Sequence, residues 1–392
     1  MKTILYITEE SPFPAFGGGR IRRYGILKAL SASGYRVLAI VGNKFKADLD
    51  HFKIKNVSFY EFTYKSDKLN MVFKYFKIFK KNKKLMRLIH SLMNNYKIDI
   101  AFPDCYFLGQ YISFFKKRNI PVIYGTENAQ SRLTLMRPNK NPLKILEKYI
   151  NYFLQYFHER LFFNRADAVI VVSPGDFQFH RKFVDESKLH IIPNFLDFSR
   201  YPAGGEKENY IVMTGTFKAY QNKCGLTWFL EKVWDDELSK RTRFIAAGYY
   251  SRELLEGIKR KNAHLRNVEA VGEVEDITPY ISRARLAVVP LFHGSGSRVK
   301  ILEAMALKTL VVSTSKGVEG ICCENAVIIA DRAEDFKKEI LNAVKNSDDD
   351  YYKSKTEEAY RIALKNYSFE VNRRKIREIL NQTLCEGKEA AS

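Results

Sequence analysis

The sequence predicts two α/β domains, each a doubly wound parallel sheet of the Rossmann-like type. Short apolar segments alternate with segments of helical period along the whole chain, a pattern typical of strand–helix–strand units. A length of 392 residues is enough for two domains with separate cores. A breaker-rich stretch at 202–205 separates two series of such elements. We therefore place one domain at 1–202, a second at 206–366 and a final helical segment at 367–392.

Each predicted strand is a short apolar run between polar or breaker residues. In the first domain these runs lie at 3–8, 36–41, 57–62, 99–103, 120–124, 168–173 and 189–192. In the second domain they lie at 209–214, 243–247, 268–271, 286–291, 310–314 and 326–330. Open α/β sheets bind ligands at the carboxyl ends of their strands. Two such domains facing across a cleft are therefore expected to hold two ligands.

The most informative stretch is Gly294–Ala306, which follows the apolar run 286–292. Its small residues, including Ser295, Gly296 and Ser297, stand directly before a predicted helix. Small residues at this position let backbone N–H groups and the positive end of the helix dipole approach an anion closely. The stretch therefore predicts an anion site.

Two cations and a carboxylate follow in the first turns of that helix. Arg298 and Lys300 stand where cations oppose the helix dipole, so their placement favours an anionic ligand over helix stability. Glu303 is suited to accept hydrogen bonds from sugar hydroxyls. A diphosphate with an attached ribose matches these features. The alternative is a surface ion pair between Lys300 and Glu303, with glycines that only make a turn.

A second glycine-rich loop follows the first predicted strand. Gly17, Gly18 and Gly19 precede a helix that runs to about residue 30, an arrangement that also suits phosphate. The dinucleotide fingerprint is absent, because Arg22 stands where the last glycine belongs. The sequence therefore does not predict a nicotinamide-dependent oxidoreductase.

The charge of the chain is large and unevenly distributed. The net charge is +21, and residues 1–200 hold 34 Lys and Arg against 16 Asp and Glu. Such a basic first half indicates an anionic partner, such as a phospholipid surface, a phosphorylated acceptor or nucleic acid. A nucleic-acid partner is not predicted, because the sequence has no recognised DNA- or RNA-binding motif. Five cysteines without a disulfide framework or a CxxC motif are typical of a cytoplasmic protein.

The segment 71–93 has the pattern of a basic amphipathic helix. Apolar side chains share one helical face: Val72, Phe76, Phe79, Met86, Ile89 and Met93. Lysines share another: Lys74, Lys77, Lys81 and Lys84. This pattern predicts a helix on an anionic membrane surface, and hence a peripheral protein at the inner face of the membrane. The alternative is a core-packing helix with a solvated basic face.

A second aromatic-rich helix is predicted at about 143–165. Its apolar residues at helical spacing are Leu146, Ile150, Phe153, Phe157 and Leu161. We expect this face to pack in the core. The alternative is that other side chains of the helix reach lipid, namely Tyr152, Phe162 and Phe163.

Several of these motifs resemble those of the GT-B glycosyltransferases, specifically glycosyltransferase family 4, over nearly the whole chain. The stretches that carry the resemblance are Gly17–Gly19, 166–173, 191–194, 272–276, Gly294–Ala306, 311–315 and 317–321. The final helix, at about 369–382, resembles the segment that crosses back onto the first domain in this fold.

The resemblance implies a retaining sugar transfer from a nucleotide-sugar, here expected to be a UDP-sugar, without a bound metal or other cofactor. Glu303 matches the family's glutamate that contacts the nucleotide ribose. The family's first glutamate of this pair is replaced by Ser295, which bears on the choice of donor sugar.

Other donor and catalytic residues are carried over by position. Gly215, Thr216 and Lys223 match the first loop of the second domain, although the family's arginine and lysine pattern is altered there. Arg298 and Lys300 are expected to supply the missing charge on the diphosphate, and Val274 is expected to offer backbone contacts to the base. Glu127 lies where the family places a histidine, and it either orients an acceptor hydroxyl or is a structural carboxylate.

The expected function is therefore that of a hexosyltransferase-like glycosyltransferase that extends a cell-surface glycan on a lipid-linked saccharide acceptor. The alternative is a catalytically inactive GT-B protein that binds nucleotides or serves as a scaffold. The replacement of the first glutamate by Ser295 and of the histidine by Glu127 favours this alternative.

Overall fold

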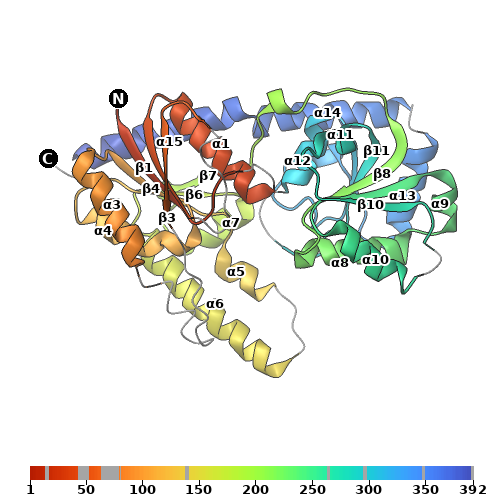
Figure 1. The fold of residues 1–392 in the computed structure, drawn as a ribbon, viewed down its shortest axis with the longest axis horizontal. Coiled ribbons are helices and arrows are strands. Elements are labelled where there is room, and N and C mark those ends of the chain that lie inside the picture. The colour runs from red at the N-terminus through yellow and green to blue at the C-terminus, as the bar shows by residue number, and fades with distance from the viewer. Residues whose placement is uncertain are drawn as a thin grey trace. The chain divides into compact units, whose positions relative to one another are not determined.

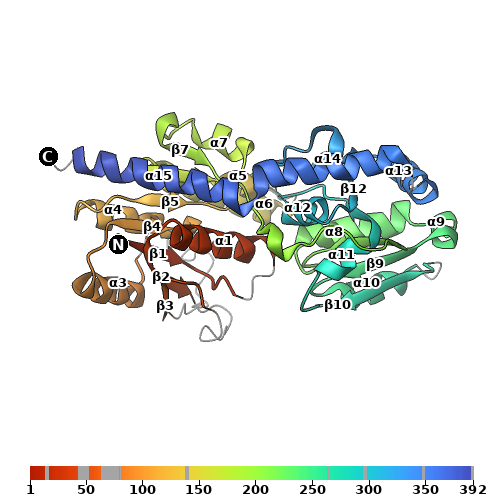
Figure 2. The same cartoon turned by 90° about the horizontal axis from the view of Figure 1, so that it is seen from above.

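The chain divides into two compact units (Figures 1 and 2). The computed structural model describes residues 1–13, 17–42, 53–62, 79, 81–136, 141–262, 265–294, 298–346 and 349–389. Unit 1 comprises 1–194 with 369–392, and unit 2 comprises 195–368. The boundary precedes the expected linker at 202–205, because Leu196 already pairs with the backbone of unit 2, its N–H donating to the Tyr367 carbonyl at 2.8 Å.

Unit 1 is built on parallel strands with β1 (Thr3–Thr8) near the middle. The order is β3 (Val57–Phe62), β2 (Arg36–Gly42), β1, β4 (Ile100–Pro103), and then β5 (Ile123–Gly125), β6 (Ala168–Val171) and β7 (Leu189–Ile191). Backbone bridges from Ala101 and Asp104 connect β4 to the β5 strand region. Strands β1, β2 and β4 are almost wholly buried, which explains their continuous apolar sequences.

The helices of unit 1 cover both faces of these strands (Figure 2). They are α1 (Gly18–Ala32), α3 (Lys83–Asn95), η3 (Tyr106–Tyr111), α4 (Ile112–Lys116), α5 (Gln130–Leu135), α6 (Pro142–Phe163), α7 (Pro174–His180) and α15 (Phe369–Glu389). Helix α15 packs along α1, although the two are far apart in the sequence. Ile376 and Leu380 of α15 are buried in this contact region.

Unit 2 is a six-stranded parallel sheet with the order β10-β9-β8-β11-β12-β13. The strands are β8 (Glu208–Thr214), β9 (Arg243–Ala247), β10 (Val268–Gly272), β11 (Ala284–Val289), β12 (Leu310–Ser313) and β13 (Ile328–Ile329). The helices are α8 (Tyr220–Trp228), α9 (Asp236–Arg241), α10 (Ser251–Lys259), α11 (Thr278–Ser282), α12 (Val299–Ala306), α13 (Ala333–Lys345) and α14 (Asp350–Tyr367). The strand order reverses between β8 and β11, which is where doubly wound sheets bind ligands.

The predicted doubly wound α/β architecture is confirmed in both units. Each of the thirteen predicted strands overlaps an observed strand. None of the helices in the described ranges combines the length and apolar character that a membrane span requires.

The predicted membrane-surface helix is only partly described. Residues 71–78 and 80 lie outside the described residues, and α3 begins after them. The apolar side chains of α3 face the core of unit 1: Leu85, Ile89 and Leu92 are buried, with Met86 and Met93 packed beside them. For this part of the segment, the membrane interpretation is wrong and the core-packing alternative is correct.

Helix α6 presents its apolar face to solvent, contrary to our expectation. Leu146, Ile150, Phe153 and Phe157 are 49–64% exposed, and of the expected face only Leu161 packs against the core. The predicted lipid-reaching residues Phe162 and Phe163 are buried instead.

Polar contacts explain this orientation of α6. The helix packs against α5 and directs Asn151, His158 and Glu159 inward, where they are buried. The Glu159 carboxylate accepts hydrogen bonds from the backbone N–H of Ser131, at 3.2 Å, and from the hydroxyl of the same residue. Hydrophobic periodicity identifies the apolar face of a helix, but it does not show which face the neighbouring elements cover.

A matched pair of substitutions tests the orientation of α6. Phe163→Ala should lower the free energy of unfolding by about 3–5 kcal/mol, because it leaves a cavity in the core. Phe153→Ala should change it by less than about 0.5 kcal/mol, because that ring is already in solvent. Urea unfolding followed by far-UV circular dichroism measures both. Equal losses in the two variants would contradict the orientation described.

Candidate functional site

The carboxyl edge of the unit 2 sheet brings together the loops that follow β8 and β11. The β8 strand leads through Gly215 into α8, and β11 leads through the Gly294 loop into α12. Gly215 has φ 148°, and a Cβ there would lie 2.9 Å from Lys300 Nζ. The β8–α8 loop and the start of α12 therefore meet at the switch point of the sheet, and the positive φ with the nearby Lys300 side chain favours glycine at position 215.

Lys300 is half-buried at this contact, and its ammonium group points into the protein. Its Nζ donates to the Thr214 carbonyl at 2.6 Å and to Asn222 Oδ1 at 2.8 Å. Burial and the neighbouring charge of Arg298 lower the pKa of Lys300 to about 7. The ammonium thus lacks a full counter-charge in the protein, and a bound anion would favour its charged form.

Arg298 stands at the N-cap of α12, with its guanidinium against Gly294. A Cβ on Gly294 would lie 3.0 Å from Arg298 Nη2. Among the described residues, no side chain caps this helix, and no acidic residue occupies its first turn. The N-terminus of α12 therefore keeps its positive dipole end available to an anion. Ser295, Gly296 and Ser297, predicted for the same site, lie outside the described residues.

Glu303 is buried one turn further along α12. It accepts a hydrogen bond from the Tyr201 hydroxyl at 3.2 Å, and burial raises its pKa to about 7. Because Glu303 is buried and Lys300 is half-buried with hydrogen-bond partners of its own, the surface ion-pair alternative is wrong. The role of Glu303 toward a ribose stays a prediction.

The remaining predicted donor residues have different environments. Thr216 is exposed in the β8–α8 loop, and its carbonyl accepts from Asn222 Nδ2 at 2.9 Å. Val274 is half-buried in the loop after β10. Lys223 is exposed on α8, and its neighbour Asn222 is the α8 residue that contacts Lys300.

Two polar residues of this site were missed in the sequence. Asn222 is a buried amide in the first turn of α8, and Tyr201 lies in a segment without regular secondary structure. Asn222 could have been found as the polar residue beside Lys223, but no local pattern indicates that it faces α12. Tyr201 carried no sequence signal, because it is distant from Glu303 along the chain.

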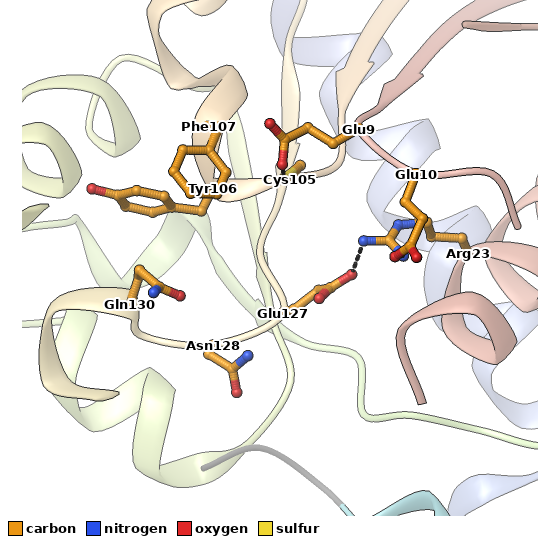
Figure 3. Close-up of a pocket in the computed structure, with 9 residues that line it drawn as sticks. All are labelled: Glu9, Glu10, Arg23, Cys105, Tyr106, Phe107, Glu127, Asn128 and Gln130. Carbon is orange, nitrogen blue, oxygen red and sulfur yellow. Dashed lines mark hydrogen bonds and ion pairs between the residues drawn. The ribbon is translucent and has the colours of Figure 1, made fainter. Parts of the chain in front are cut away.

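Unit 1 contains a cavity of about 200 Å³ at the carboxyl ends of its strands (Figure 3). The segments that follow β1, β4 and β5 line it, including the start of η3 and the first residue of α5, together with one residue of α1. The lining residues are Glu9, Glu10, Arg23, Cys105, Tyr106, Phe107, Glu127, Asn128 and Gln130. Three carboxylates and one guanidinium make this a net acidic cavity, with two aromatic rings on one side.

Arg23 holds two of these carboxylates in place. Its guanidinium is paired with Glu127, and its Nη1 lies 3.0 Å from Glu10 Oε2. Burial opposes the charge on Arg23, but Glu127 and other neighbours outweigh this effect, so its pKa is raised overall. Glu127 is therefore a fixed carboxylate at a cavity, a geometry compatible with both roles considered for it.

The glycine loop of unit 1 lies beside the same cavity. Gly17 has φ 77° and precedes α1, so Gly18 and Gly19 form the first turn of that helix. A Cβ on Gly19 would lie 3.2 Å from Arg23 Nη1 and 3.3 Å from Glu127 Oε1. Within this unit the helix start thus faces a carboxylate of the protein, and phosphate binding there stays a prediction.

The described part of the chain contains no cluster arranged as a metal site. No three His, Cys, Asp or Glu side chains described there come together in a way that could hold a metal ion. The Cys105 thiol at the cavity has a raised pKa, caused by burial and by the nearby Glu9 and Glu127. It is therefore protonated and unsuited to be a nucleophile near neutral pH.

Family models match both halves of the chain. Residues 16–200 match the model described as Glycosyltransferase Family 4, and residues 208–346 match the model described as Glycosyl transferases group 1. Together these matches cover well over half of the chain.

Individual proteins are similar over most of their length. A Klebsiella pneumoniae protein, described as an uncharacterized 44.6 kDa protein in the cps region, is 24% identical over 370 residues, 88% of this chain and 92% of that protein. Sucrose-phosphate synthase from Thermosynechococcus elongatus has a TM-score of 0.78 at 16% identity, and the match covers 100% of both chains. Anabaena HepE, solved in complex with UDP-glucose, has a TM-score of 0.68 at 14% identity over 97% of this chain and 100% of that one.

Replacing Glu303 should change how stability depends on pH. The folded pKa of about 7 lies above the ordinary value of 4.5, so the stabilisation is present below pH 4.5 and is lost as the pH rises through 7. From pH 5 to pH 8, the free energy of unfolding of the wild type should fall by on the order of 2 kcal/mol through this group. Glu303→Gln should not show this loss. Urea unfolding of unit 2, followed by the fluorescence of Trp228 and Trp234, measures this difference. Glu256→Gln, on the exposed face of α10, is the control and should behave like wild type; a Glu303→Gln profile parallel to wild type would contradict the prediction.

Proposed function

The chain belongs to the GT-B glycosyltransferases, with a family 4 domain followed by a group 1 domain, and from this premise we propose the reaction it performs. It transfers a sugar from a nucleotide-sugar donor to a saccharide acceptor, with retention of the anomeric configuration. Unit 2 binds the donor and unit 1 binds the acceptor.

The observation that carries the donor assignment is the half-buried Lys300, whose ammonium group is held at the switch point of the unit 2 sheet. When the bond from the anomeric carbon to the diphosphate oxygen breaks, negative charge grows on the leaving diphosphate. Lys300, Arg298 and the N-terminus of α12 are positive groups placed to stabilise that charge. In this proposal these groups act without a metal ion. Anabaena HepE, with the same fold, binds UDP-glucose, which supports a UDP-sugar as donor.

The acceptor assignment is based on the cavity of unit 1. Carboxylates accept hydrogen bonds from sugar hydroxyls, and aromatic rings pack against the apolar faces of sugar rings. Glu127 and Glu10, oriented by Arg23, supply the first kind of contact, and Tyr106 and Phe107 supply the second. Glu127 orients the attacking hydroxyl of the acceptor in this scheme.

We further propose that the acceptor is a lipid-linked saccharide of cell-surface polysaccharide synthesis. The similarity to a protein of the Klebsiella pneumoniae cps region supports this setting. The basic first half of the chain supports an acceptor or surface with negative charge. A protein that binds nucleotides without turnover is the second candidate, favoured by Ser295 at the position of the family's first glutamate.

Arg298→Ala should reduce sugar transfer from the accepted donor by about 10²–10³-fold, because one preorganised charge on the diphosphate is lost. Released nucleoside diphosphate, measured across a panel of nucleotide-sugars, gives the rate. Lys240→Ala is the matched control, since Lys240 lies on α9 before β9, at the opposite end of the strands. The enzyme assignment fails if no donor is consumed, and tight nucleotide binding without turnover would support the second candidate.

Glu127→Gln should lower the transfer rate while donor binding stays close to that of wild type. The substitution removes a carboxylate from the acceptor cavity in unit 1, whereas the proposed diphosphate contacts belong to unit 2. Transfer rates and UDP affinity by calorimetry provide the two readouts. Weakened UDP binding in this variant would contradict the assignment of the two ligands to separate units.

A further inference from the structure

Helix α6 carries a continuous apolar stripe on its solvent side. The members of this stripe are Leu143, Leu146, Tyr149, Ile150, Phe153 and Phe157. Their exposed fractions range from 48% for Tyr149 to 78% for Leu143. The spacing of three and four residues places them along one side of a helix of 22 residues, about 33 Å long. Contiguous apolar surface of this extent marks an interaction site.

The stripe cannot turn inward without breaking buried polar contacts. The opposite side of α6 holds Glu159 in hydrogen bonds with Ser131 and holds Gln155 in a hydrogen bond with the Thr134 hydroxyl, at 2.6 Å. Burying the stripe would expose these groups and would place apolar side chains against their polar partners. The outward orientation is therefore built into the packing of α5 on α6.

A cationic group stands beside the C-terminal part of the stripe. Phe79 packs against Phe157, with ring centres 6.2 Å apart, and Lys81 follows two residues later. Lys81 and Arg118 both lie over the ring of Phe114, at 5.4 and 3.9 Å from its centre. Burial and the charges of Lys117 and Arg118 lower the pKa of Lys81, which shows how closely these cations are crowded. A cluster of positive charges of this kind attracts an anionic partner.

We propose that the α6 stripe docks on the surface of an anionic lipid bilayer, with Lys81, Lys117 and Arg118 contacting the headgroups. Exposed Phe, Leu and Tyr side chains are typical of helices that lie in the interface between headgroups and acyl chains. Figure 1 shows that α6 extends away from the strands of unit 1, and the side chains of the stripe are at least 48% exposed. The apolar part of the docking surface thus lies on α6, and the 71–93 segment to which the sequence pattern points contributes Lys81 at its edge.

The proposal rests on the proposed function in that a lipid-linked acceptor brings the enzyme to a membrane. It places the apolar contact on α6, and the basic groups add an electrostatic attraction that salt screens. Vesicle binding and sugar transfer are separate measurements, so either proposal can fail alone.

Flotation of the purified full chain with vesicles tests the docking surface. Wild type should float with phosphatidylglycerol-containing vesicles at low salt, less at high salt, and little with phosphatidylcholine alone. Leu146→Asp/Phe153→Asp should weaken the anionic-vesicle binding at least about tenfold, because the stripe must enter the interface. Phe153→Ser alone, a milder change at an exposed site, should weaken it in the same direction.

Leu364→Asp is the matched control, because Leu364 is also an exposed leucine, on α14 of unit 2. Its vesicle binding should equal that of wild type, and UDP binding should be retained by every variant that folds. The proposal is overturned if wild type does not bind anionic vesicles, or if the stripe variants bind as well as wild type. It is also overturned if light scattering shows a wild-type dimer that the stripe variants convert to monomers, since a second copy would then cover the stripe.

Discussion

The ammonium group of Lys300 organises the carboxyl edge of unit 2. Lys300 reaches from the start of α12 to the last carbonyl of β8 and to the Asn222 amide on α8, so three elements meet at one nitrogen. Burying such a group is costly, and its two neutral acceptors compensate only part of that cost. Gly215 completes the arrangement, because a side chain at that position would collide with the ammonium. This arrangement is the basis of the proposed diphosphate site, because an anion there would stabilise positive groups that are already in place.

In unit 1 the carboxyl ends of the strands carry acidic side chains, whereas the corresponding edge of unit 2 carries the cation Lys300. The loops that follow its central strands gather Glu9, Glu10 and Glu127 around a cavity, and Arg23 fixes two of these carboxylates. A carboxylate cluster repels phosphate and accepts hydrogen bonds from hydroxyl groups, whereas the cations at the edge of unit 2 attract phosphate. Two units of one architecture therefore differ in charge at their strand ends through a few side chains, and the proposed donor and acceptor assignments follow that difference.

The fold was predictable from the sequence, because apolar runs of the right length mark buried parallel strands wherever they occur. The start of α12 was predictable for a local reason, because the small residues of the Gly294–Ala306 stretch stand directly before the helix in the sequence. The orientation of α6 was not predictable, because polar contacts from Ser131 and Thr134 decide it and those residues lie outside the helix. Asn222 and Tyr201 were missed because their importance arises only when distant segments meet. Whether Asn222 or Lys223 faces Lys300 depends on the direction of each side chain around α8. The sequence alone does not give that direction.

The two ends of the chain meet in unit 1, where α15 packs along α1, whereas unit 2 is continuous from 195 to 368. Synthesis on the ribosome therefore completes unit 2 while unit 1 still lacks its last helix. The surface of α1 against which α15 packs stays uncovered until residues 369–389 have been synthesised. A premature stop codon shortly before Phe369 would consequently damage the first-made half of the protein and leave the later-made half whole.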